Sequence, residues 1–286
     1  MEYAAVKRAL LADDALRVRV FIRKSNPAGF WRDDTTPRPV SVSSLAELGK
    51  TTAVVLQDVP AEALGRLSTT LASFVRAGGG LAVLTGASSA GRGYSGTALG
   101  EVLPVSPGPW SYVDELFGVQ PSGGSGPLGG AVAAFAVPFS SLPTIRGKVL
   151  LGATKGGAEV VLRAGGAPLL VSWQVGRGKV ALLGTDGLHR WTFSPRGAEE
   201  GEKAQQALWG AMVGWLTEVR DDRPVVAEFE RDQYQMGTPA RLLVQVTDPS
   251  FQPVTSAQVT AELQPARGVR VPGAYTHLTL PTLSSG

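Results

Sequence analysis

The feature that most constrains the fold is a pair of short apolar runs separated by an amphipathic segment. Thr52–Gln57 and Leu81–Thr85 are continuous apolar runs of the kind found in buried parallel strands. Between them, Ala61–Ala77 has apolar residues three and four positions apart, which places them on one face of a helix. These residues are Leu64, Leu67, Leu71, Phe74 and Val75. This order predicts a strand–helix–strand crossover, the repeating unit of a doubly wound parallel sheet.

Later segments supply the other elements of an α/β domain. Leu169–Gln174 and Lys179–Gly184 flank a glycine turn and predict an antiparallel hairpin. Glu199–Val219 predicts the longest helix, with acidic residues in its first turn, where the helix dipole favours anions. The shorter elements that we expect are a helix at Glu2–Ala12 and strands at Leu16–Lys24, Lys148–Gly152 and Glu159–Leu162. Gly86–Gly130 is rich in glycine, serine and proline and predicts loops. The fold class predicted is α/β with a doubly wound, mostly parallel sheet.

The domain organisation follows from where this pattern stops. We expect residues 1–220 to form the α/β domain and residues 221–272 to form a partial immunoglobulin-like β segment, a truncated β-sandwich. Val225–Phe229 and Ala240–Thr247 alternate as exposed strands at the start of that segment. Residues 273–286 show no periodicity that joins them to the rest and resemble translated adapter sequence, so we expect an artefactual tail.

Composition excludes several classes of function. A formal net charge of +3, spread along the chain, is too small to predict a nucleic-acid groove. No stretch approaches the roughly 20 apolar residues of a membrane helix, so we expect membrane contact only through segments outside this sequence. The chain has 0 cysteines, which removes disulfides, thiolate nucleophiles and sulfur metal ligands together. We therefore expect no metal site.

The loops after the strands ending at Gln57, Thr85 and Gly184 are the places to look for chemistry, because sites in such sheets lie at the carboxyl ends of the strands. Thr85 is followed by the glycine loop Gly86–Gly91, in which Ser88 also offers a hydroxyl. A hydroxyl needs an adjacent base to become a nucleophile, and the Gly-x-Ser-x-Gly pattern is missing. These side chains are candidates for catalysis, with turn formation and helix capping as the structural alternative.

The stretch Thr185–Trp191 contains the candidate acid–base side chains of the chain. His189 is one of 2 histidines, and the other, His277, lies in the expected tail, so any histidine-dependent catalysis must use His189. Asp186 could orient His189 only if the loop folds back. The alternative is that both residues bind backbone groups and fix the loop beneath Trp191.

A dinucleotide cofactor is not expected. Gly91–Gly96 matches the G-x-G-x-x-G pattern, but it lies six residues beyond Thr85 instead of in a strand-to-helix turn, and no helix pattern follows. We therefore predict no cofactor.

Three runs resemble a known family. They are Phe74–Gly86, Gly93–Val105 and Gly176–Asp186 followed by Arg190 and Trp191. In this order they resemble the class I glutamine amidotransferase-like domain of bacterial membrane-anchored proteins, which is commonly linked to a von Willebrand factor A domain and followed by immunoglobulin-like strands. The resemblance covers about residues 1–220 and implies a flavodoxin-like sheet. Within these runs, Tyr94, Arg190 and Trp191 are the binding residues that we predict.

The resemblance implies a role but not an activity. The family name refers to glutamine amidotransfer, yet the cysteine nucleophile is absent here, so glutaminase activity is not expected. The first hypothesis is a non-catalytic binding or scaffolding module, in a fragment of a bacterial protein that is membrane-associated on the extracytoplasmic face. Its partners would be a protein or other domains of the same longer chain. The alternative is a hydrolase that uses the Thr85 or Ser88 hydroxyl with His189.

Overall fold

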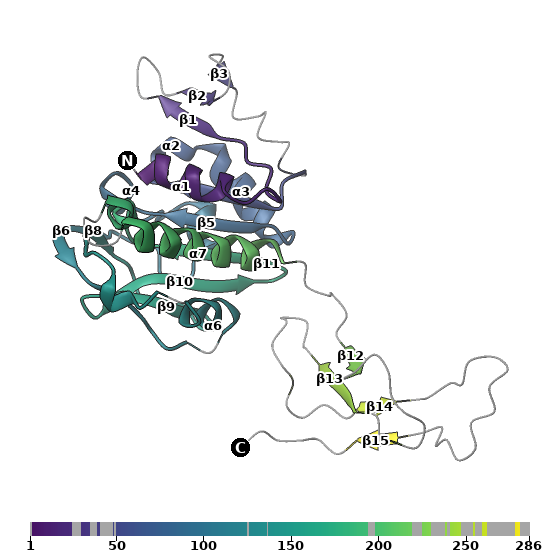
Figure 1. The fold of residues 1–286 in the computed structure, drawn as a ribbon. Helices are drawn as coiled ribbons and strands as arrows, with labels where there is room; N and C mark the ends of the chain where they lie inside the picture. Colours follow the sequence, from purple (N-terminus) through teal and green to yellow (C-terminus); the bar gives the residue numbers. More distant parts are fainter. Residues whose placement is uncertain are drawn as a thin grey trace. The chain divides into compact units, whose positions relative to one another are not determined.

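The chain divides into two compact units, Met1–Glu218 and Val219–Gly286, which Figure 1 draws in a computed structural model. The structure describes residues 2–24, 30–34, 39–40, 48, 50–124, 126–135, 137–193, 198–218, 225–229, 238, 241–246, 254, 259–261 and 278–280. His277 lies outside these ranges.

A six-stranded mixed sheet forms the centre of the first unit. Its strand order is β4 (Ala53–Gln57), β5 (Gly80–Leu84), β11 (Gly178–Leu183), β10 (Ala167–Val175), β9 (Glu159–Ala164) and β7 (Val119–Pro121). The β4–β5 and β5–β11 pairs are parallel, whereas the pairs from β11 to β7 are antiparallel. The α/β class is therefore confirmed, but the prediction of a mostly parallel sheet is wrong.

Short loops explain the antiparallel half of the sheet. Gly176 has φ 59° between β10 and β11, and Gly165 and Gly166 have φ 53° and 76° between β9 and β10. Such tight glycine turns return the chain directly beside the preceding strand, whereas a parallel neighbour needs a long crossover. The predicted hairpin is confirmed, and the same turn chemistry adds β9 to it.

The predicted crossover forms the parallel half of the sheet. β4 leads into α2 (Ala61–Leu64) and α3 (Arg66–Arg76), and then into β5. Gly65, at φ 48°, divides the single helix that the sequence predicts. The apolar face is largely as predicted, because Leu64, Leu67, Leu71 and Val75 are buried. β5 is buried on both faces of the sheet, with Leu81 and Val83 in one core cluster and Ala82 and Leu84 in the other.

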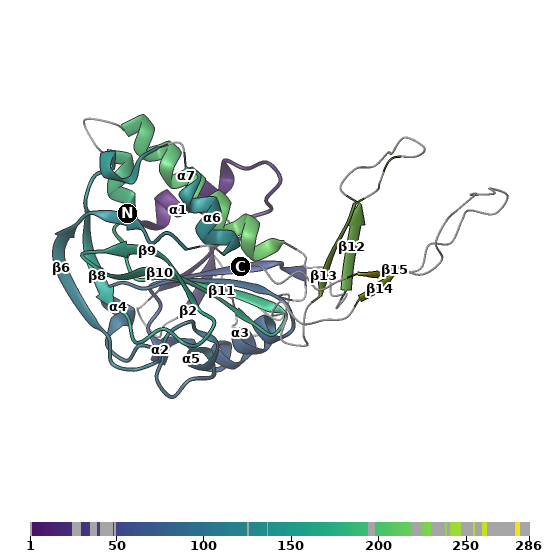
Figure 2. The same cartoon turned by 90° about the horizontal axis from the view of Figure 1, so that it is seen from below.

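Helices cover both faces of the sheet (Figure 2). One face is covered by α1 (Glu2–Leu11), α6 (Pro127–Ala133) and α7 (Ala198–Thr217), and the other by α2, α3 and α5 (Ala98–Val102). The predicted long helix is α7, which buries Leu208, Trp209 and Met212. No helix in the described ranges is long and apolar enough to cross a membrane.

Smaller elements surround this sheet. The region expected to be loops contains α4 (Ala87–Ala90), β6 (Ser111–Phe117) and β7, and β6 pairs antiparallel with β8 (Ile145–Leu150). The strand expected at Leu16–Lys24 is shorter: β1 (Phe21–Lys24) pairs with β2 (Phe30–Asp33), which pairs with β3 (Pro39–Val40). The described residues also include the 3-10 segments η2 (Phe139–Ser141) and η3 (Leu188–Phe193).

The second unit contains two antiparallel strand pairs among its described residues. β12 (Val225–Phe229) pairs with β13 (Leu242–Val246), where the sequence predicts exposed strands. β14 (Val259–Ala261) pairs with β15 (Leu278–Leu280). β15 lies within residues 273–286, the segment expected from the sequence to be an artefactual tail.

Candidate functional site

The candidate site lies where the three parallel strands end. Gln57 is paired with Leu84, and Leu84 with Leu183, so β4, β5 and β11 finish side by side. The Asp58 amide donates to the Leu84 carbonyl, and the Thr85 amide donates to the Leu183 carbonyl. The loops that the sequence indicated for chemistry therefore meet at one edge of the sheet.

Asp58 is the centre of this edge. Its carboxylate accepts hydrogen bonds from the amides of Gly86 at 2.9 Å and Ser89 at 2.9 Å, and from the Ser89 hydroxyl at 2.8 Å. Asp58 has φ 42°, a left-handed conformation that costs a non-glycine residue free energy. These bonds cap the start of α4 and hold the strained backbone in place. Asp58 was not among the predicted site residues, although it follows a buried strand at the edge where sites are expected.

A second carboxylate, that of Asp186, lies near Gly86. A Cβ at Gly86 would lie 2.8 Å from Asp186 Oδ2 and 2.9 Å from Asp58 Cγ, so both carboxyl groups face the same side of this glycine. Burial raises the pKa of Asp186, and the nearby charge of Asp58 raises it further. Burial likewise raises the pKa of Tyr112, with Asp186 as the next cause. The edge is therefore anionic.

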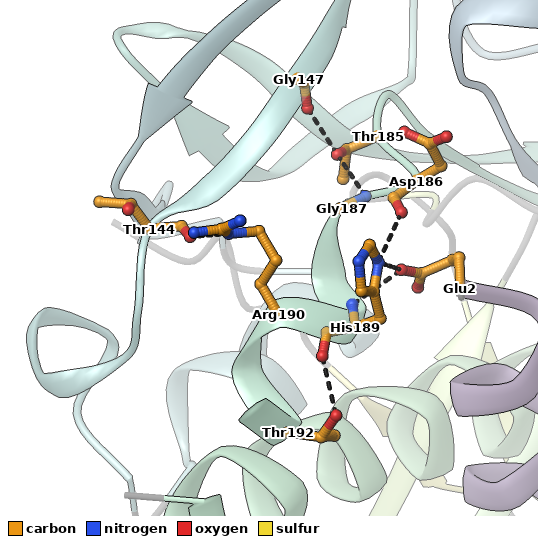
Figure 3. Close-up of polar contacts among 9 residues, drawn as sticks. All are labelled: Glu2, Thr144, Gly147, Thr185, Asp186, Gly187, His189, Arg190 and Thr192. Carbon is orange, nitrogen blue, oxygen red and sulfur yellow. Dashed lines mark hydrogen bonds and ion pairs between the residues drawn. The ribbon is translucent and has the colours of Figure 1, made fainter. Parts of the chain in front are cut away.

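The imidazole ring of His189 is bound to the Glu2 carboxylate (Figure 3). Its Nδ1 lies 2.9 Å from Glu2 Oε2 and 3.1 Å from the Asp186 carbonyl, and its amide donates to the same Glu2 oxygen at 2.7 Å. The Asp186 carboxylate points away from the imidazole in Figure 3. The predicted structural alternative holds for His189, which binds a backbone carbonyl of its own loop. Glu2, which is only 4% exposed, was missed by the sequence reasoning.

The Glu2–His189 pair makes stability depend on pH. The hydrogen bond from Glu2 raises the pKa of His189, and burial raises the pKa of Glu2. Both groups therefore bind protons more tightly in the folded state, so their contribution is present at low pH and is lost as the pH rises. His189→Gln is expected to lower the free energy of unfolding by about 1 kcal/mol below about pH 6, and by less at each higher pH.

This expectation is checked by chemical denaturation of the full chain and the variant from about pH 5.5 to about pH 8.5, across the ordinary pKa of histidine. Arg190→Gln is the matched control, because Arg190 is exposed and, among the residues that the structure describes, its side chain donates to the Thr144 carbonyl, at 3.2 Å. Its effect should not change with pH. A His189→Gln effect that grows as the pH rises would contradict the assignment.

The two candidate hydroxyls lie apart from the imidazole. Thr85 is fully buried, and its Oγ1 donates to the Leu183 carbonyl at 3.2 Å. Ser88 is exposed, and its amide lies 3.4 Å from Asp58 Oδ2. Neither hydroxyl forms a hydrogen bond with His189 in the described structure. Among the described residues other than glycine, only Asp58 and Tyr94 have positive φ, so the Gly86–Ser89 turn is not a strained nucleophile elbow.

Two of the three predicted binding residues belong to the core, which corrects the prediction. Tyr94 is fully buried, and its hydroxyl donates to the Val59 carbonyl at 2.8 Å. Trp191 is also fully buried and packs edge-on against Phe139. Neither ring can contact a ligand on the surface in this conformation. Arg190 alone of the three is exposed.

Comparisons with known proteins are weak. No protein-family model and no curated protein matches the chain. Among solved structures, one cytoplasmic protein of Salmonella typhimurium is 18% identical, with a TM-score of 0.49 over 70% of this chain and 95% of that chain. A second has the same 18% identity and a TM-score of 0.45 over 70% of this chain and 96% of that chain. An exo-β-1,4-mannosidase from an Opitutaceae bacterium is 14% identical, with a TM-score of 0.37 over 58% of this chain and 26% of that chain. The argument for function therefore rests on the geometry of the site.

Proposed function

We propose that residues 1–220 form a non-catalytic binding or scaffolding module. Its fold would be class I glutamine amidotransferase-like and flavodoxin-like, followed by the start of an immunoglobulin-like β segment. Support for this finer assignment comes from the β4–β5 crossover, from the helices on both faces of the sheet and from the β12–β13 pair. The resemblance of its motifs suggests a longer, membrane-anchored bacterial protein with this module on the extracytoplasmic face.

The observation that carries the proposal is the position of the Asp58 carboxylate. Acyl-transfer enzymes stabilise a developing oxyanion with preorganised donors, often backbone amides. Here the amides of Gly86 and Ser89, beside the loop where a nucleophile would be expected, already donate to Asp58. A second carboxylate, Asp186, faces the same glycine. An oxyanion would have to displace one negative charge and lie beside another, which is unfavourable at short range.

The candidate catalytic groups support the same conclusion. An oxygen nucleophile needs a base within hydrogen-bonding reach. The Thr85 hydroxyl donates to the Leu183 carbonyl, and neither it nor the Ser88 hydroxyl is hydrogen-bonded to His189 in the described part of the chain. The hydrolase alternative requires a contact between these groups that this conformation does not make.

Active-site labelling tests the proposal. The full chain is treated with a fluorophosphonate, which phosphonylates activated serine and threonine hydroxyls with loss of fluoride, and its mass and peptides are then measured. We expect no adduct on Ser88 or Thr85, in the wild type or in His189→Ala. A stoichiometric adduct on Ser88 in the wild type that disappears in His189→Ala would contradict a non-catalytic role.

A further inference from the structure

The outer face of α1 borders an open groove that the candidate site does not use. The groove has a volume of about 620 Å³ and lies between α1 and the turn that contains Asp34. Glu2, which binds His189, is on the opposite, buried face of the helix together with Ala5, Val6 and Leu10. The groove is therefore separate from the carboxyl edge of the sheet.

The groove gathers exposed apolar side chains. Tyr3 is 36% exposed and Leu11 is 52% exposed, and both line it. Among the described residues of the first unit, the other exposed large apolar side chains are Leu116 and Leu150. Clustered apolar exposure on a folded domain marks interaction sites, whereas scattered residues do not. Tyr3 and Leu11 are eight residues apart on one helix face, which is about 12 Å along the axis.

The two cationic side chains of the groove differ in their ion pairing. Lys7 forms an ion pair with Asp34. Arg8, which also lines the groove, is exposed and has no ion-pair partner in the described part of the chain. Ala4 and Ala12 flank Arg8 at helical spacing, and such small residues let another helix approach closely. The surface is thus an apolar stripe beside one uncompensated cation.

We infer that this groove is a docking site for an acidic amphipathic helix of a protein partner. Apolar side chains of that helix would contact Tyr3 and Leu11, and a carboxylate would pair with Arg8, as in other helix-in-groove complexes. The inference rests on the proposed function, a binding module, and names the chemistry of its partner.

Two other occupants fit less well. Anionic lipid surfaces select clusters of about four to eight cations, whereas Lys7 is already neutralised and leaves Arg8 as the uncompensated cation of the groove. A second copy docked by two-fold symmetry would present the same patch, in which the Asp34 carboxylate is already paired with Lys7, so it would offer Arg8 no unpaired carboxylate from the described lining. An acidic partner helix needs only one cation in the groove and supplies a carboxylate for Arg8.

Fluorescence anisotropy with designed peptides tests the inference. The probes are two helical peptides, each about 18 residues long so that the helix is populated. They share one apolar stripe and differ only in carrying glutamates or lysines beside it. The full chain is expected to bind the glutamate peptide roughly tenfold more tightly than the lysine peptide. Arg8→Glu should reverse that preference, and Leu11→Asp should weaken binding of the glutamate peptide roughly tenfold.

Leu116→Asp is the matched control, because Leu116 is 60% exposed and does not line the groove. It should bind the glutamate peptide like the wild type. Equal affinity for the two peptides, or full binding by Leu11→Asp, would overturn the inference. If the chain self-associates in sedimentation and Leu11→Asp abolishes this, the occupant is a second copy and not a partner helix. If the chain binds phosphatidylglycerol vesicles and Arg8→Glu abolishes this, the occupant is a membrane surface. Labelling of Ser88 would contradict the proposed function alone, so the two failures are distinguishable.

Discussion

Asp58→Ala is expected to lower the free energy of unfolding by about 3 kcal/mol, the largest effect of any single change at the site. Alanine removes the acceptor of the Ser89 amide and of the Ser89 hydroxyl, and leaves the Gly86 amide with only its 3.1 Å bond to Ser89 Oγ. It must also adopt φ 42° without a side chain that can compensate. For a domain of this size, the melting temperature should fall by roughly 6–12 °C, which thermal denaturation of the full chain measures.

Two variants separate these causes. Asp58→Asn keeps a carbonyl acceptor and a side chain that tolerates positive φ, so it should cost about 1 kcal/mol. Asp58→Gly relieves the backbone strain but not the lost hydrogen bonds, so it should fall between the other two. If Asp58→Ala proves as stable as Asp58→Asn, the carboxylate does not hold the edge together.

Lys179→Met is expected to destabilise the fold by about 2–3 kcal/mol, because it removes a buried cap of α7. The Lys179 side chain is 5% exposed. Its Nζ donates to the Trp215 carbonyl at 2.8 Å, the Glu218 carbonyl at 3.2 Å and Glu218 Oε2 at 2.8 Å. A cation at this position satisfies carbonyls at the end of the helix and complements the helix dipole. Methionine fills the same space but donates no hydrogen bond.

The matched control for this prediction is Lys203→Met. Lys203 pairs with Glu199 one turn away on the exposed surface of the same helix, and such pairs contribute little. Urea denaturation of both variants measures the difference. Equal stability of Lys179→Met and Lys203→Met would show that the buried lysine does not cap α7.

Apolar periodicity and turn residues in the sequence predict the β4–β5 crossover, the hairpin at Gly176 and helix α7. The apolar runs before α2 and after α3 belong to β4 and β5, strands of a sheet that helices cover on both faces, so their type could be recognised from sequence. The hairpin at Gly176 and the helix α7 follow from turn chemistry and periodicity in the same way. β4, β5 and β11 run in the same direction, so their carboxyl ends meet at one edge of the sheet. This rule is enough to place Thr85 and Asp186 at that edge.

Contacts between residues far apart in the sequence determine the features that local patterns do not predict. Glu2 and His189 are separated by 187 residues, and no spacing rule joins a residue at the start of a helix to a loop after β11. Tyr94 and Trp191 lie in the runs that resemble a known family and are predicted to bind a ligand, yet tertiary packing buries both. A strand at the position of β9 is predicted, but its antiparallel pairing with β10 and with β7 is not, because periodicity does not determine strand direction.

Release of ammonia or acid from glutamine and from amide and ester panels tests the central claim most directly. Full-length wild type is compared with His189→Ala and with Asp58→Asn, which retains the turn but not the charge. The Gly86 and Ser89 amides, which would have to stabilise an oxyanion, already donate to the Asp58 side chain. The rate of product release should therefore not exceed the rate in buffer alone for the wild type or for either variant. Turnover by the wild type that His189→Ala abolishes would contradict the account.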